Sequence, residues 1–243
     1  MTQQQIIFRD IGRVGYQDAW DYQEALLKEN VGKKTLTRQR EYAGDDSAGG
    51  EEEDTKHYLL FVEHSPVYTI GKSGNLDNVL LSEESLKARG IDFFRTNRGG
   101  DITFHGPGQV VGYPILDLEK FYTDIGKYLR NLEEVVIRTL AEYGIKGDRS
   151  PGETGVWIDP DKIGRERKIC AIGVRCSRWV TMHGFALNVN TDLDYFNFII
   201  PCGIQGKQVT SIDKELGRAV DMEEVKEKLK YHFEQVFEAS ILP

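Results

Sequence analysis

The chain has 243 residues, 40% of them hydrophobic, which is enough for one large domain with a sizeable core. Its net charge of -8 and isoelectric point near 5.3 argue against a nucleic-acid-binding protein, which normally carries a basic face. With three cysteines, no signal-peptide pattern and no apolar run of transmembrane length, we expect a reducing cytoplasmic location without disulfides.

Three segments show the periodicity of amphipathic helices. The first contains Tyr16, Ala19, Trp20 and Leu27. The second has the strongest pattern, Ile125, Leu129, Leu132, Val136 and Leu140, and Gly144 is suited to end it. The third follows a capping pair formed by Asp221 and Glu224 and contains Val225, Leu229, Phe233 and Val236.

Strand-like runs lie between these helices, at 57–62, 110–116, 168–174 and 179–189. The helices and strands alternate without a βαβ repeat, and we find no internal repeat. The pattern therefore predicts an α+β fold in which helices flank a mixed β-sheet, organised as one domain over residues 1–243.

Residues 33–56 form the one stretch of low hydrophobicity, with blocks of charge and an Ala-Gly-Gly step. Such a composition cannot bury much apolar area. We expect a solvated, flexible insertion here, and an extra partner-docking element is the alternative.

A glycine-rich motif, RGGDITFHGPGQVVGYPI, begins at Arg98. It is too dense in glycine for a buried strand or a helix, and glycine is common where another molecule approaches the backbone closely. It matches neither a Walker loop nor a dinucleotide-binding turn. We interpret it as a ligand-lining loop that leads into a sheet.

Two reactive side chains stand out in the second half of the chain. Lys168 lies in an apolar run, where a charge is costly unless it has a partner or a role. Cys202 lies between Pro201 and Gly203, at a corner that would expose its thiol. The pair suggests acyl transfer through a cysteine thioester, although a snorkelling lysine and an ordinary buried thiol would explain each residue alone.

Five ordered motifs, EHSPVYTIGK, RGGDITFHGPGQVVGYPI, KICAIGV, HGFALNV and PCGI, resemble those of the lipoyl(octanoyl) transferases of the lipoate-protein ligase B type. The resemblance covers roughly residues 6–212, except the segment near 33–56, which is short in most relatives. It implies the fold of the biotin and lipoate protein ligase catalytic domains. It also implies an acyltransferase that acts without a cofactor.

The resemblance assigns roles to particular residues of this chain. Cys202 would be the thioester nucleophile, and Lys168 would lower its pKa. The substrate-binding residues would be Arg98, Gly99, Gly100, Asp101, Ile102, Thr103, Phe104, His105, Ala171, Ile172, Gly173, Gly184, Phe185 and Ala186. The donor would be octanoyl-acyl carrier protein. The acceptors would be lipoyl domains of 2-oxoacid dehydrogenase E2 subunits and the glycine cleavage H protein, with no nucleic acid and no membrane involved.

Acyl carrier proteins are acidic, so an acidic enzyme needs a local basic patch to dock one. Candidates near the motifs are Lys72, Arg98, Arg165, Arg167, Arg175 and Arg178. Plain solvated surface charge explains them equally well.

Several alternatives stay open. An ATP-dependent lipoate or biotin ligase, and a non-catalytic module that binds acyl groups or lipoyl domains, would share this fold. Cys170 is the main rival to Cys202, because residues 168 and 170 share a face in regular strand geometry. A zinc site is disfavoured, since the cysteine spacing is not that of a structural knuckle. We expect a pocket role for His105 and surface positions for His57 and His232. His183 could either orient a loop or cap its strand.

Overall fold

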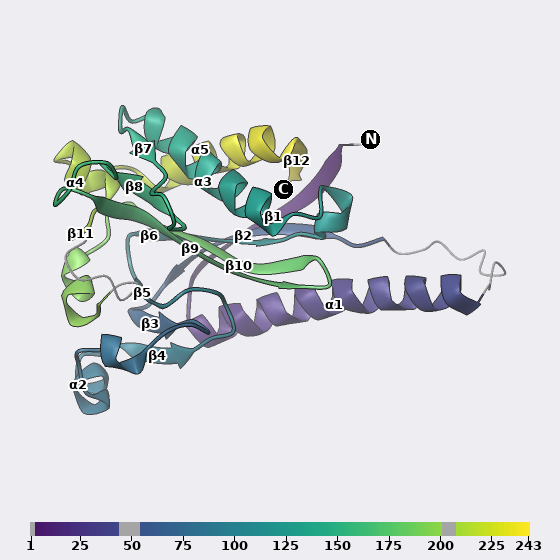
Figure 1. Ribbon diagram of the computed structural model, residues 1–243, viewed down its shortest axis with the longest axis horizontal. Helices are drawn as coiled ribbons and strands as arrows, with labels where there is room; N and C mark the ends of the chain where they lie inside the picture. Colours follow the sequence, from purple (N-terminus) through teal and green to yellow (C-terminus); the bar gives the residue numbers. More distant parts are fainter. Residues whose placement is uncertain (1–2, 44–53, 201–207) are drawn as a thin grey trace.

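The computed structural model describes residues 3–43, 54–200 and 208–243 (Figure 1). Its main sheet has nine strands in the described residues, in the order β12-β1-β2-β6-β10-β9-β8-β7, with β11 paired to β9. These strands are β1 (Gln4–Val14), β2 (His57–His64), β6 (Gln109–Ile115), β7 (Gly147–Asp148), β8 (Val156–Ile158), β9 (Arg167–Ser177), β10 (Val180–Asn188), β11 (Gln208–Val209) and β12 (Ala239–Leu242).

A second sheet of three strands lies beside the first. Its order is β4-β3-β5, with bounds β3 (Val67–Ile70), β4 (Asp92–Arg95) and β5 (Ile102–His105). The helices are α1 (Tyr16–Ala43), α2 (Glu83–Ala88), α3 (Ile125–Ala141), α4 (Ile212–Leu216) and α5 (Met222–Phe237). Short 3₁₀ helices cover Leu76–Asn78, Leu118–Lys120 and Leu193–Phe198.

The main sheet is mixed, as the sequence predicts. β1 runs parallel to both β12 and β2, and β11 runs parallel to β9. The pairs β2–β6, β6–β10, β10–β9, β9–β8 and β8–β7 are antiparallel. The α+β prediction is therefore confirmed.

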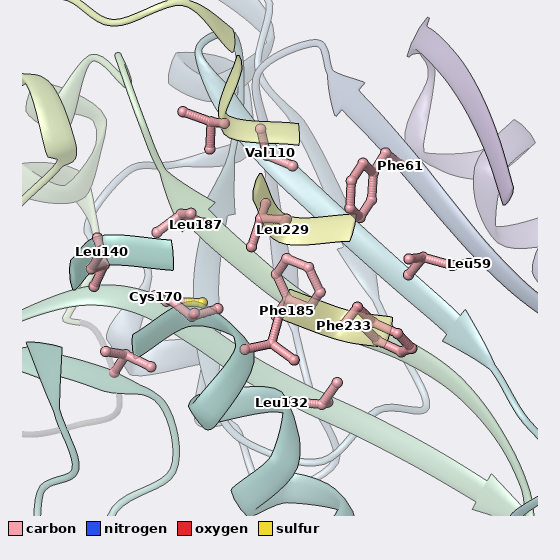
Figure 2. Close-up of a cluster of buried hydrophobic side chains, with 14 of the residues drawn as sticks. Leu59, Phe61, Val110, Leu132, Leu140, Cys170, Phe185, Leu187, Leu229 and Phe233 are labelled. Carbon is pink, nitrogen blue, oxygen red and sulfur yellow. The ribbon is translucent and has the colours of Figure 1, made fainter. Parts of the chain in front are cut away.

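Helices cover both faces of this sheet (Figure 1). α3 and α5 pack on one face through Leu132, Leu229 and Phe233, which meet Phe61 and other strand residues in one core (Figure 2). On the opposite face α1 packs through Ala19, Leu26 and Leu27. A strand covered on both faces must be apolar at consecutive positions, which explains the unbroken run Tyr58–Val62 of β2. Each fully buried side chain of this size contributes about 2–3 kcal/mol.

The predicted helices are confirmed, and their ends follow the predicted signals. α5 begins after Asp221, whose side chain accepts the Glu223 N–H. α3 ends at Ala141, and Gly144 has the positive φ of +72° expected at a helix stop. The strands predicted at 57–62, 110–116, 168–174 and 179–189 correspond to β2, β6, β9 and β10.

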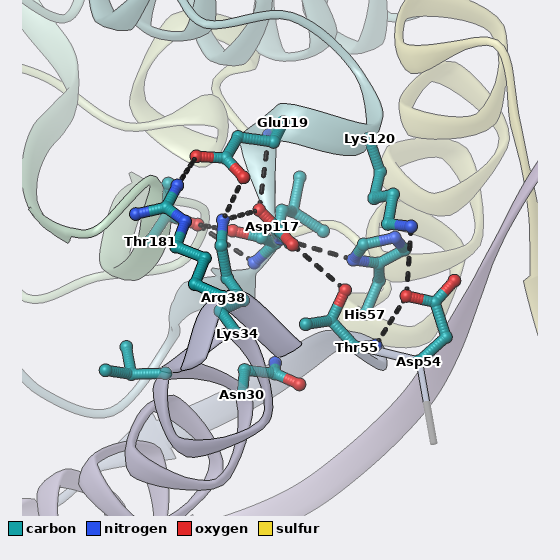
Figure 3. Close-up of polar contacts among 12 residues, drawn as sticks. Asn30, Lys34, Arg38, Asp54, Thr55, His57, Asp117, Glu119, Lys120 and Thr181 are labelled. Atoms are coloured by element: carbon teal, nitrogen blue, oxygen red, sulfur yellow. Dashed lines mark hydrogen bonds and ion pairs between the residues drawn. The ribbon is translucent and has the colours of Figure 1, made fainter. Parts of the chain in front are cut away.

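The loop predicted from residue 33 is wrong for residues 33–43, because α1 continues without interruption to Ala43. The reason is a contact distant in sequence. Lys34 is buried and pairs with Asp117 and with Glu119, the latter at 3.0 Å, while Arg38 reaches Glu119 at 2.8 Å (Figure 3). Residues 44–53 of the predicted insertion lie outside the described residues.

Residues 54–56 return along the same helix. Asn30 of α1 donates to the Lys56 carbonyl at 2.7 Å and accepts the Lys56 N–H at 2.9 Å. Thr55 donates to Asp117 at 3.0 Å (Figure 3). The chain therefore enters β2 from a position fixed by α1 and Asp117.

Two further expectations are corrected. The glycine-rich motif contains a strand, β5, in which Ile102, Phe104 and His105 are buried, and Ile102 and Phe104 pack into the core of the three-stranded sheet. His57 is not at the surface. It is 3% exposed, its Nε2 contacts Gln4 at 3.1 Å, and its Nδ1 accepts the Asp117 N–H at 3.2 Å. Among the helices in the described part of the chain, none combines the length and apolar character that crossing a membrane requires.

Candidate active site

A cavity of about 420 Å³ lies between the two sheets and the start of α1. Its walls come from β5, β6, β9 and β10, with Tyr16 of α1 and Trp157 of β8. Ala171, Ile172, Phe185 and Ala186 give the middle of the β9–β10 wall an apolar surface. A concave apolar space with a few polar groups is the usual form of a small-molecule site.

The predicted substrate-binding residues line this cavity, with two exceptions. Those that line it are Arg98, Gly100, Asp101, Ile102, Thr103, His105, Ala171, Ile172, Gly173, Gly184, Phe185 and Ala186. Gly99 instead donates its N–H to the Val174 carbonyl at 2.9 Å, which fastens the glycine-rich motif to β9. Phe104 points into the core of the small sheet, where its ring stacks on Tyr195 at 4.5 Å. Neither residue lines the cavity, and a substrate contact for them stays a prediction.

Lys168 lies at one end of the cavity, where β9 is flanked by β8 and β11. Its Nζ lies 4.6 Å from the centre of the Trp157 ring. An indole face attracts an ammonium group and so holds Lys168 at the cavity wall. Trp157 did not emerge from the sequence, where its only signal is the short apolar run that follows Gly155.

Cys170 does not share the face of Lys168, so that expectation is wrong. The pairing of β8 with β9 shifts between Val156 and Trp157, because Val156 pairs with Cys170 and Trp157 with Lys168. This bulge directs both Ile169 and Cys170 into the core, and Figure 2 shows Cys170 there. Burial raises the pKa of the Cys170 thiol. A fully buried thiol with a raised pKa is a poor nucleophile.

The other two cysteines of the chain are Cys176 and Cys202. Cys176 is half-buried near the end of β9, as expected, and burial raises the pKa of its thiol. Cys202 falls in 201–207, outside the described residues. Phe196 before that segment and Gln208 and Val209 after it line the cavity.

A directed chain of hydrogen bonds crosses the polar wall of the cavity. Gln109 donates its amide N–H groups to the Phe104 carbonyl and to Asn188 Oδ1, at 3.2 and 2.8 Å, so its oxygen must accept from His105 Nδ1 at 2.9 Å. His105 Nε2 is then the acceptor for the Thr69 hydroxyl at 3.3 Å.

This chain of hydrogen bonds extends further at both ends. Arg98 Nη2 donates to Thr69 Oγ1 at 3.0 Å and to the Thr69 carbonyl at 2.6 Å. At the other end Asn188 donates to the Thr210 carbonyl at 3.0 Å, and the Thr210 N–H donates to the Lys168 carbonyl at 2.9 Å. These hydrogen bonds therefore link Arg98 of the glycine-rich motif to β9, the strand that carries Lys168.

The histidines around the cavity are neutral at pH 7. Burial lowers the pKa of His183 to about 3, aided by Arg98 and Arg175, and lowers that of His64 to about 4. The pKa of His105 also lies well below its usual value, chiefly through burial. Arg98, 7% exposed, therefore supplies a fixed positive charge that these histidines do not.

The six basic residues proposed for docking do not form one patch. Arg98 is buried, Arg175 pairs with Glu24, and Arg167 bonds to Glu215 at 2.6 Å and to Asp159 at 2.8 Å. Only Lys72, Arg165 and Arg178 of this set are exposed. Among the described residues, no group of three His, Cys, Asp or Glu side chains could hold a metal ion.

The lipoyl protein ligase A/B catalytic domain, as a family model, matches residues 15–234. An octanoyltransferase of Christiangramia forsetii is 58% identical over 236 residues, covering 96% of each chain, and one of Flavobacterium psychrophilum is 57% identical, covering 98% of each.

Solved structures agree on the fold. A bipartite lipoate protein ligase of Thermoplasma acidophilum has a TM-score of 0.64 at 18% identity, covering 99% of this chain and 88% of that one. A lipoate-protein ligase A bound with ATP has a TM-score of 0.64 at 17% identity, covering 100% and 88%. The chain therefore belongs to the lipoyl protein ligase A/B catalytic-domain family, among its octanoyltransferases, and is an acyltransferase of protein lipoylation.

Proposed function

We propose that the enzyme takes the octanoyl group from octanoyl-acyl carrier protein, holds it as a thioester on Cys202, and passes it to a lysine of a lipoyl domain. The acceptors would be the lipoyl domains of 2-oxoacid dehydrogenase E2 subunits and the glycine cleavage H protein, in the cytoplasm. The observation that carries the proposal is the position of Lys168, whose ammonium group lies against Trp157 at the end of a largely apolar cavity.

The segment that follows Cys202 supports its role. β11 begins six residues after it and pairs with Arg167 and Lys168. Because Phe196 on the other side also lines the cavity, both flanks of the Cys202 segment reach the same space. Cys170 offers no competing nucleophile, since it is buried in the core.

The first half-reaction uses Lys168 as a cation. A free cysteine has a pKa near ~8.5, so holding it as thiolate at pH 7 costs about 2 kcal/mol, and a nearby ammonium offsets part of this. The thiolate attacks the thioester carbonyl, the bond to the carrier sulfur breaks, and Lys168 gives its proton to the departing thiolate. The octanoyl group is then bonded to Cys202.

The second half-reaction uses the same residue as a base. The acceptor lysine has a pKa near ~10.4, so presenting it as a neutral amine costs about 4.6 kcal/mol at pH 7. Lys168, now neutral, accepts the proton released as the amine attacks the Cys202 thioester. An amide forms, the Cys202 thiolate leaves, and Lys168 regains the charge it had at the start.

Intact-protein mass after incubation with octanoyl-acyl carrier protein tests the nucleophile. We expect one octanoyl adduct that hydroxylamine removes, no turnover in Cys202→Ser, and most of the activity in Cys170→Ala. The reverse pattern in the two variants would contradict the assignment. ATP-dependent octanoylation from free octanoate, without an adduct, would instead identify a ligase.

Lys168→Arg separates the two roles, because arginine keeps a cation but cannot act as a base at neutral pH. In single-turnover measurements, adduct formation should survive in part, while transfer to the lipoyl domain should fall by at least about 100-fold. Lys146→Arg, at an exposed position, is the matched control and should leave both steps unchanged. Full transfer activity in Lys168→Arg would exclude Lys168 as the base.

A further inference from the structure

β11 is held beside Lys168 by more than strand pairing. It pairs with β9 over two residues, Gln208 with Arg167 and Val209 with Lys168. Just beyond, the Thr210 N–H donates to the Lys168 carbonyl at 2.9 Å. A strand is usually longer than this, and so short a pairing specifies its register only weakly. The position of β11 on β9 therefore depends on further contacts.

Glu215 supplies those contacts through its carboxylate. Its Oε1 accepts from Arg167 Nε and its Oε2 from Arg167 Nη2, each at 2.6 Å. Its Oε1 also accepts from the Thr210 hydroxyl at 2.6 Å. Two parallel bonds between a guanidinium and a carboxylate fix direction as well as distance. One carboxylate thus joins the residue before Lys168 to the residue after β11. We call Arg167, Thr210 and Glu215 the β11 clamp.

Neighbouring strands fix both sides of the β11 clamp. Arg167 Nη1 also donates to Asp159 Oδ2 at 2.8 Å, just after the end of β8. Thr210 is fully buried, and its carbonyl accepts from Asn188 of β10 at 3.0 Å. Glu215 itself lies in α4. The β11 clamp therefore connects α4 to the strands at the lysine end of the cavity.

In the sequence, Cys202 lies between two positions that the fold fixes. Before it, the Ile200 N–H donates to the Asn78 carbonyl at 2.9 Å. After it, Thr210 is held by Glu215. The register of β11 on β9 therefore limits where the chain that carries the proposed thiol returns to the proposed ammonium.

We infer that Glu215 is a positioning residue of octanoyl transfer, which holds the chain that follows Cys202 in register with Lys168. The described lining of the cavity does not include Glu215, so it acts through Arg167 and Thr210 and not on the substrate. The inference rests on the thioester chemistry proposed above.

The sign of one effect separates positioning from charge. In Glu215→Ala the loss of a carboxylate leaves the surroundings more positive, which by itself would lower the pKa of the Cys202 thiol. Loss of register would instead move the thiol away from the ammonium, and its pKa would rise toward ~8.5, the value of a free cysteine. The two explanations therefore predict opposite changes in the amount of thiolate.

The measurement is the rate of Cys202 alkylation by iodoacetamide against pH, followed by the mass of the peptide that contains it, together with the rate of octanoyl adduct formation. At pH 7 we expect both rates in Glu215→Ala to fall by about fivefold or more, and at pH 9, where the thiol ionises unaided, to lie within about threefold of wild type. Recovery at pH 9 also shows that the variant is folded. An equal loss at both pH values, or an unchanged or faster rate at pH 7, would overturn the inference.

Two further variants assign the effect to the β11 clamp. Arg167→Lys keeps the charge but cannot form two parallel bonds, so it should show the same pH-dependent loss, by about threefold or more at pH 7. A wild-type profile in this variant would contradict the role of the clamp.

Glu134 of α3 is the matched control. Its carboxylate also accepts from two arginines, Arg138 at 2.9 Å and Arg149 at 2.8 Å, but belongs to no part of the β11 clamp. Glu134→Ala should leave both rates within about twofold of wild type at each pH. A loss as large as that of Glu215→Ala would show that the effect is not specific to the β11 clamp, and would overturn the inference.

Failure of the proposed function and failure of this inference give different results. Without the proposed thioester, the wild type itself would form no octanoyl adduct on Cys202. If only the inference fails, the wild type forms the adduct and Glu215→Ala does not shift its dependence on pH.

Discussion

Two cavities of nearly equal volume, about 420 and 440 Å³, have opposite chemistry. The cavity beside Lys168, which we call the acyl cavity after the function proposed above, is walled by strands, glycines and neutral histidines. The other lies under the second half of α1, and its lining is mostly charged: Lys33, Lys34, Thr37, Arg38, Glu41, Asp54, Thr55, Asp117, Glu119 and Lys120. Figure 3 shows the ion pairs of Lys34 and Arg38 among them.

The difference lies in how the polar groups are used. Under α1, Lys34 pairs with two carboxylates, Asp117 also accepts from Thr55, and Lys120 pairs with Asp54 at 3.0 Å. These charges satisfy one another and fasten a helix. In the acyl cavity the described residues leave His183 Nδ1 without a hydrogen-bond partner. Volume alone therefore does not identify a site, whereas polar groups held in position without a partner do.

The largest effect should come from the backbone that shapes the acyl cavity. A Cβ at Gly184 would lie 2.1 Å from the Gly112 carbonyl oxygen of β6, which cannot move aside without breaking the sheet. We expect Gly184→Ala to lower the free energy of unfolding by about 3 kcal/mol or more, measured by urea denaturation. At Gly99 a Cβ meets only an ordinary contact at 3.5 Å, so Gly99→Ala is the control. Equal stability of both variants would contradict this account.

A somewhat smaller effect is expected under α1. Lys34→Met leaves Asp117 buried with one cation fewer, and we expect a loss of about 2 to 3 kcal/mol. Because this cavity only fastens the helix, octanoyl transfer by the folded variant should match that of the wild type. Lys28→Met, at an exposed position of the same helix, should change stability by less than about 0.5 kcal/mol. A loss of transfer activity in folded Lys34→Met would break the distinction between the two cavities.

The smallest expected effect is a loss of folding stability at acid pH. Burial lowers the pKa of His57 to about 4, against about 6.5 in the unfolded chain, so the unfolded state binds the proton first as pH falls. Stability due to His57 is complete above pH 6.5 and is lost progressively between 6.5 and 4, by about 2 kcal/mol at pH 5. His57→Gln should flatten the unfolding free energy over this range relative to the wild type. Parallel pH profiles would show that His57 is not the group involved.

The helices and central strands were predictable because their signals are local. The spacing of Leu132, Val136 and Leu140 needs only an apolar surface to face, and the sheet supplies it. Asp221 caps its helix through an N–H two residues away. These features depend only on residues close together in the sequence, so they can be recognised from one amino-acid sequence.

The predictions that were wrong share a different origin, which is contacts between residues far apart in the sequence. The second half of α1 has no apolar stripe, and its order depends on Asp117, more than eighty residues from Lys34. The sequence places His57 at the surface, but in the fold it is buried and its Nδ1 accepts the backbone N–H of the same aspartate. The bulge at Ile169 exists only because β8 pairs out of step with β9, so the direction of Cys170 could not be read from alternation. The motif residues were found by resemblance, whereas Trp157 lies outside every motif and enters the cavity through the pairing of β8 with β9.

The order in which the sheet is made follows from one pairing. Ala239–Leu242 of β12 lie alongside Gln4–Ile7 of β1, so the first described strand receives one neighbour from β2 and the other from the last described strand. On the ribosome the outer edge of β1 therefore stays open while every other described strand is made. An open edge invites pairing with other chains, so β1 is exposed to wrong pairing until β12 has been made.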